Sequence, residues 1–107
     1  MTSKAPLRRF GRREIREARA YAAAGGQALH VWTPSEGERA AFSARGLAAP
    51  FRRARVWAHL LDQDRERLVA TARRLGVRVV RVGRPGTPHQ HVDLCAGPLD
   101  RALAECS

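Results

Sequence analysis

The fold is decided by residues 55–82, which read RVWAHLLDQDRERLVATARRLGVRVVRV. The apolar run at residues 56–61 predicts a strand. Residues 62–75 repeat leucine and alanine at helical spacing, and Gly76 is typical of a helix end because glycine adopts the left-handed conformation without steric cost. Residues 77–82 are apolar on both faces, a pattern that favours an internal and often parallel strand. Strand, helix and strand in this order predict a right-handed crossover.

The segments on either side extend this pattern. Residues 28–32 predict another strand, because they are mostly apolar and a proline soon follows them. Ser35 lies three residues before Glu38, which is the spacing of a capping box, so we expect a short helix that ends at Gly46. Asp62 is the expected N-cap of the central helix, since its carboxylate can accept hydrogen bonds from free backbone N–H groups. A last short helix is predicted after the Gly-Pro pair near the C-terminus.

Together these elements predict an α/β fold with a small sheet of three or four mostly parallel strands, flanked by helices. At 107 residues the chain is expected to form one main unit, a small α/β domain at residues 27–107. Residues 1–26 are expected to form a basic N-terminal segment. Within it, residues 1–9 indicate a flexible basic arm and residues 12–24 a helix with one basic face.

The strongest compositional feature is positive charge. The chain has 20 Lys and Arg against 10 Asp and Glu, for a net charge of +10. Such a surface attracts polyanions, which predicts a small basic nucleic-acid-binding protein that contacts phosphates through arginine. The candidate contacts are Arg8, Arg9, Arg12, Arg13, Arg16, Arg19, Arg52 and Arg53. Two alternatives stay open: an acidic protein partner, or a compositional bias, because Lys4 is the single lysine and alanine is abundant.

A second candidate site is a cluster of metal-binding residue types. His89, His91 and Asp93 alternate, so their side chains share one face of an extended segment, and His59 lies on the predicted strand at residues 56–61. Imidazole and carboxylate are ligands for Zn²⁺, Mn²⁺ or Fe²⁺. This pattern predicts a metal-dependent hydrolase or nuclease that holds one divalent ion. The alternatives are ordinary surface histidines and an Asp93 that caps the last helix or pairs with arginine.

Several other classes of function lack support in the sequence. The Gly/Pro-rich residues 83–88 contain no lysine and two prolines, so a rigid turn is favoured over a phosphate-binding loop. Cys95 and Cys106 are expected as free thiols, and no serine or threonine has the partners of a catalytic nucleophile. No apolar run reaches the ~20 residues of a membrane span, and the basic N-terminus lacks a signal-peptide core. We therefore expect a cytoplasmic protein.

The sequence resembles the DUF4031 family, which comprises small bacterial and phage-encoded proteins of unknown function. The matching motifs are Trp57-Ala58-His59-Leu60, Ala72-Arg73-Arg74-Leu75-Gly76 and His91-Val92-Asp93-Leu94. The resemblance implies a small α/β fold and directs attention to His59, His91 and Asp93, but it implies no activity. One departure is the run Val31-Trp32-Thr33-Pro34, which lacks the aspartate found in the corresponding strand of the family.

Overall fold

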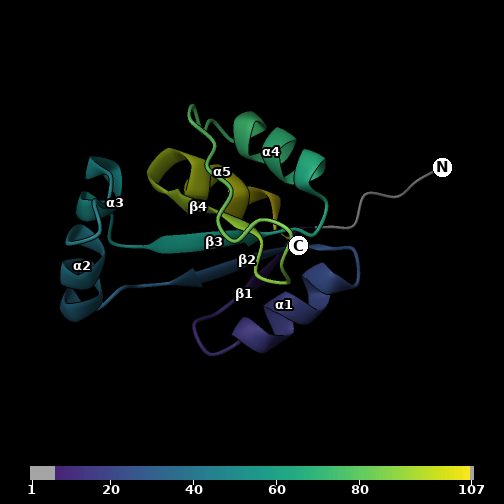
Figure 1. Cartoon of the computed structure of the whole chain (residues 1–107), viewed down its shortest axis with the longest axis horizontal. Helices are drawn as coiled ribbons and strands as arrows, with labels where there is room; N and C mark the ends of the chain where they lie inside the picture. Colours follow the sequence, from purple (N-terminus) through teal and green to yellow (C-terminus); the bar gives the residue numbers. More distant parts are fainter. Residues whose placement is uncertain (1–6, 107) are drawn as a thin grey trace.

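The structure, a computed structural model, describes residues 7–106. Over this range it is an α/β fold in which a four-stranded mixed sheet is flanked by helices (Figure 1). The elements in chain order are β1 (Leu7–Phe10), α1 (Ile15–Ala23), β2 (Gln27–Trp32), α2 (Glu36–Ser43), α3 (Ala49–Arg53), β3 (Trp57–Leu61), α4 (Arg65–Arg74), β4 (His91–Cys95) and α5 (Ala96–Glu105).

The sheet order is β1-β2-β3-β4, and only β1 and β2 run parallel. The expectation of a mostly parallel sheet was therefore wrong, and so was the predicted strand at residues 77–82, which adopts no regular structure. The position beside β3 is taken by β4, which buries Val92 and Leu94 on one face. Val79 is left 72% exposed. Apolar and polar residues alternate in β4, which suits a strand with one buried and one open face. The longer valine run at residues 77–82 is apolar on both faces and does not suit this position.

The N-terminal segment differs from its predicted form. Residues 7–9, expected in a flexible arm, belong to β1, where Leu7 and Phe10 are buried. The first six residues of the predicted arm lie outside the described range. The predicted helix begins only at Ile15, so Arg12 and Arg13 lie in the turn before it. Gly25 ends the helix region with a φ of +102°, as the sequence indicated.

The two faces of the sheet are covered unequally. On one face Leu29, Leu60 and Val92 pack with α4 and α5 to form the larger core cluster. On the other face Ala28 and Leu61 pack against α1 in a smaller cluster. Figure 1 shows α4 and α5 on one side of the sheet, α1 on the other, and α2 with α3 beyond one end of β2 and β3. The face that carries α1 is only partly covered, and this leaves room for a site.

Of the two N-caps predicted from the sequence, one is confirmed and one is wrong. Ser35 and Glu38 form the predicted capping box at the start of α2. The N-cap of α4, however, is Asp64 and not Asp62. Residues 49–53, which include the candidate contacts Arg52 and Arg53, form the short helix α3, and Pro50 suits its first turn.

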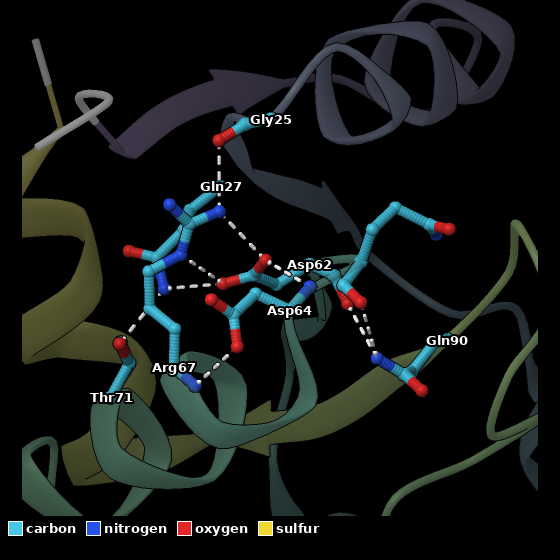
Figure 2. A network of polar contacts seen from close by, with 8 residues as sticks. Gly25, Gln27, Asp62, Asp64, Arg67, Thr71 and Gln90 are labelled. Carbon is cyan, nitrogen blue, oxygen red and sulfur yellow. Dashed lines mark hydrogen bonds and ion pairs between the residues drawn. The ribbon is translucent and has the colours of Figure 1, made fainter.

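Asp62 instead lies fully buried at the end of β3, at the centre of a polar network (Figure 2). Arg67 donates to it through Nε and a terminal nitrogen at 2.7 and 2.8 Å. Gln27 donates to it at 2.9 Å and to Thr71 at 2.8 Å. Gln90 donates to the carbonyl of Asp62 at 2.9 Å. The network therefore joins β2, β3, α4 and the segment that leads into β4.

None of the helices within residues 7–106 combines the length and the apolar character needed to cross a bilayer.

Candidate metal site and its pocket

Three rows of side chains cross the partly covered face of the sheet. The strand register places Trp32 opposite Trp57, and Trp57 opposite Cys95, in what we call the aromatic row. The next, central row consists of His30, His59 and Asp93, which are paired in the same way. The third row consists of Ala28, Leu61 and His91. Because side chains alternate along a strand, the members of all three rows project from one face.

The metal-binding residue types meet where the central and third rows adjoin. The Asp93 Oδ1 atom lies 3.3 Å from Nε2 of His59 and 3.4 Å from Nε2 of His91. One ligand atom from each residue falls within 4.8 Å of the other two. Two ligands bound to zinc at about 2.1 Å in a tetrahedron stand about 3.4 Å apart. The two measured distances therefore match the edge of a zinc coordination sphere.

The orientation of the His91 ring is fixed by a hydrogen bond on the side that faces away from the cluster. Its Nδ1 lies 2.7 Å from the carbonyl oxygen of His89, which can only accept, so Nδ1 carries a proton and Nε2 faces the cluster. Gly83 flanks the ring: its backbone bonds to that of His91 in both directions, at 2.8 and 3.1 Å. A backbone carbonyl behind a histidine is the usual support of a metal ligand.

Without a metal, the electrostatics of the cluster favour the ligand forms of His59 and Asp93 but strengthen proton binding by His91. Burial lowers the pKa of His59 to about 4, although the charge of Asp93 opposes the shift, so this ring is neutral. Burial alone would lower the pKa of His91, but its hydrogen bonds to Asp93 and to the His89 carbonyl outweigh burial and raise it. Burial would raise the pKa of Asp93, yet the hydrogen bond from His91 and the nearby histidine charges hold it below its usual value. Asp93 is thus a carboxylate.

A pocket of about 450 Å³ opens beside the cluster. It is lined by a basic group of three arginines and four histidines, together with apolar and aromatic side chains and one glutamate: Arg12, Arg19, Arg84, His30, His59, His89, His91, Ile15, Leu61, Trp32, Phe42 and Glu38. His30 is nearly buried there, with Nε2 3.0 Å from the carbonyl of Arg12 and with a buried Nδ1 that has no partner among the described residues.

The predicted metal ligands are brought together only in part. His59, His91 and Asp93 form the cluster, whereas the half-buried His89 supplies only its backbone carbonyl. His30, which lies opposite His59 in the central row, was not among the predicted site residues. The sequence did contain a pattern that points to His30: His30 and Trp32 are two residues apart on a predicted strand, as Trp57 and His59 are on another.

The predicted arginine contacts do not form one surface around this site. Arg12 and Arg19 line the pocket, while Arg8 lies over the rings of Phe10 and Tyr21. Arg9, Arg13 and Arg16 are exposed on β1, in the turn after it and on α1. Arg52 and Arg53 lie on α3, which Figure 1 shows at one end of the molecule, away from α1. Arg84 was not among the predicted contacts, because the sequence of residues 83–88 indicated only a turn.

Comparison with known proteins adds no family assignment. A scan against protein-family models gave no match, and searches of curated proteins and of solved structures likewise found no similar protein. The resemblance to the DUF4031 family therefore stays a prediction.

Proposed function

We propose that the protein is a metal-dependent hydrolase that holds one divalent ion with His59, His91 and Asp93. The observation that carries this proposal is the pair of distances, 3.3 and 3.4 Å, from one oxygen of Asp93 to the two imidazole nitrogens. Two imidazoles and one carboxylate are the ligand set of several hydrolytic zinc centres, in which the fourth position takes water.

The surroundings of the cluster fit hydrolysis better than a purely structural ion. A structural zinc site uses four protein ligands, whereas the group here offers three. Two of the three, His59 and His91, also line the pocket, so a water on the open position would face any bound substrate. A divalent ion makes such a water acidic enough to act as hydroxide near neutral pH. In hydrolysis this oxygen adds to the substrate, the bond to the leaving group breaks, and the leaving group takes a proton.

The test is metal binding by the isolated protein. After chelation and dialysis, zinc and manganese are titrated by calorimetry into the unaltered protein and into the variants His59→Ala, His91→Ala and Asp93→Asn. We expect each substitution to weaken binding at least about tenfold, because two remaining ligands hold the ion poorly. His89→Ala is the matched control, since it removes a nearby imidazole and keeps the backbone carbonyl that supports His91. Unchanged metal affinity in His91→Ala would overturn the proposal.

We also propose, as a second function, binding of nucleic acid through arginine–phosphate contacts. The supporting observation is that Arg13, Arg16, Arg52 and Arg53 are exposed and form no ion pair within residues 7–106. Affinity for an oligonucleotide should then fall steeply as salt rises, because each phosphate contact releases bound counterions. Fluorescence anisotropy at several salt concentrations measures this slope. Affinity that does not change with ionic strength would contradict the proposal. Tighter binding to an acidic protein than to the oligonucleotide would instead favour an acidic protein partner.

A further inference from the structure

The pocket has two chemically different ends. One end lies at the aromatic row, where Trp32 and Phe42 line it. The other end lies beyond the third row, where Gly83 pairs with His91 and the following Arg84 joins Arg19 on the pocket wall. The central row, with His30 and His59, lies between these ends. The pocket therefore runs from aromatic rings, past the proposed metal ligands, to positive charge.

The basic end contains guanidinium groups without a carboxylate partner. Arg12 is not part of this end: it lies beside Thr33, next to Trp32, and is already paired with Glu38 at 3.0 Å. Arg19 and Arg84 form no ion pair within residues 7–106, and the buried Nε of Arg19 has no hydrogen-bond partner there. The other four N–H donors of a guanidinium lie on its two terminal nitrogens, and Arg19 and Arg84 both line the pocket. Two unpaired guanidiniums around one space select an anion, and their planar donors suit phosphate oxygens.

The backbone at Arg84 adds an independent observation. Its φ is +48°, in the left-handed region that residues other than glycine rarely adopt. A glycine would occupy this turn position without strain, yet an arginine lies there on the pocket wall. The strained position thus places a positive charge beside His91 and His89.

The aromatic end offers ring faces. Phe42 is one of the two large apolar side chains exposed within residues 7–106, at 37%. Trp32 is half-buried, and its ring lies 4.7 Å from that of His59 and 5.3 Å from that of His30, between centroids. Aromatic side chains of this kind stack on nucleobases, and every base has a face to offer. A volume of about 450 Å³ falls in the ordinary range for a small-molecule site.

We propose that this pocket binds a nucleoside phosphate, with its phosphate on Arg19 and Arg84 and its base at Trp32 and Phe42. The claim that a nucleoside phosphate is the substrate rests on the proposed hydrolase function. Binding of the nucleoside phosphate by itself requires no metal. The reaction would be hydrolysis of a phosphate ester: the oxygen of water bonds to phosphorus, the ester P–O bond breaks, and the departing oxygen receives a proton from water. The products are the alcohol and inorganic phosphate.

The test uses the full chain kept in a chelator, so that a failure of metal binding does not affect it. Adenosine monophosphate, ribose 5-phosphate and adenosine are titrated by calorimetry and by tryptophan fluorescence. We expect the monophosphate to bind at least about tenfold more tightly than either fragment, because only it engages both ends. Arg19→Ala and Arg84→Gly should each weaken its binding about tenfold, whereas Phe42→Ala should weaken adenosine and leave ribose 5-phosphate unchanged.

Arg73→Ala is the matched control, because it removes an exposed charge on α4, on the opposite side of the sheet from α1, and should leave all three affinities unchanged. Arg84→Gly keeps the test valid if another variant misfolds, since glycine relieves the positive φ. Equal losses in Arg73→Ala and Arg84→Gly would show general charge attraction and overturn the proposal. Absence of monophosphate binding, or equal binding of adenosine, would also overturn it. Zinc titration of the same sample reports separately on the proposed metal site.

Discussion

The substitution Arg67→Ala gives the most direct test of how the fold is held together. Arg67 donates twice to Asp62, whose side chain is 0% exposed, and once to the carbonyl of Gly25 at 2.8 Å. After the substitution Asp62 keeps only two donors, the amide of Gln27 and the backbone N–H of Asp64. Removing one partner of a buried ion pair costs about 3–5 kcal/mol, since the remaining charge stays buried without compensation.

The partial exposure of Arg67 decides where in this range the cost falls. Its side chain is 33% exposed, so water can enter the space that it leaves, and we expect a loss of about 3 kcal/mol. For a domain of this size, that loss lowers the melting temperature by more than about 10 °C. Urea unfolding followed by circular dichroism measures the free energy of unfolding. Arg73→Ala, at an exposed position of the same helix, should change it by less than about 0.5 kcal/mol.

A double substitution separates loss of charge pairing from loss of packing. With Asp62→Asn already in place, no carboxylate is left unpaired, so Arg67→Ala should then cost clearly less than it does alone. If Arg67→Ala alone costs less than about 1 kcal/mol, or costs the same in both backgrounds, the pairing of these two side chains does not stabilise the fold as argued.

Three further predictions follow from local geometry. In Gly83→Ala the new Cβ would lie 2.6 Å from Cε1 and 2.7 Å from Nε2 of His91, so the imidazole must move; calorimetry should show weaker zinc binding although every ligand is retained, and unchanged affinity would contradict the arrangement. His59 has a pKa of about 4 when folded and about 6.5 when unfolded, so the unfolded chain takes up its proton first as pH falls. The metal-free protein should therefore lose stability between pH 6.5 and 4, and urea unfolding should show a shallower loss in His59→Gln; parallel pH profiles would refute this. Gly37→Ala, in the first turn of α2, meets no atom closer than 3.9 Å and should stabilise the protein by about 0.5–1 kcal/mol in thermal unfolding, whereas a lower melting temperature would contradict it.

Local patterns in the sequence were enough to predict elements whose signals lie within a few residues. The capping box of Ser35 and Glu38, the helix that closes at Gly76, and the apolar strand around His59 all appear in the structure. Such signals depend on backbone hydrogen bonding and on side-chain periodicity, and both are properties of a short segment. The α/β class followed from these elements.

The choice of strand partner was decided only by the tertiary structure. Residues 77–82 have the composition of a strand, but the single free edge beside β3 accepts one neighbour, and β4 fills it with Val92 and Leu94 inward. The same competition placed Leu7–Phe10 in the sheet beside β2. A sequence pattern shows that a segment can pair but not which edge is available, because that depends on every other segment.

The candidate site shows the same division. The sequence by itself determined which chemistry is available, since the alternation of His91 and Asp93 places both on one face of any strand, and His59 lies on another strand. Only the antiparallel register of β3 and β4 brought Asp93 opposite His59 at 3.3 Å. The addition of His30 and Arg84 to the same pocket is likewise a tertiary result. Register and packing are set by the burial of the whole sheet, and a shift of one residue would have turned every one of these side chains to the other face.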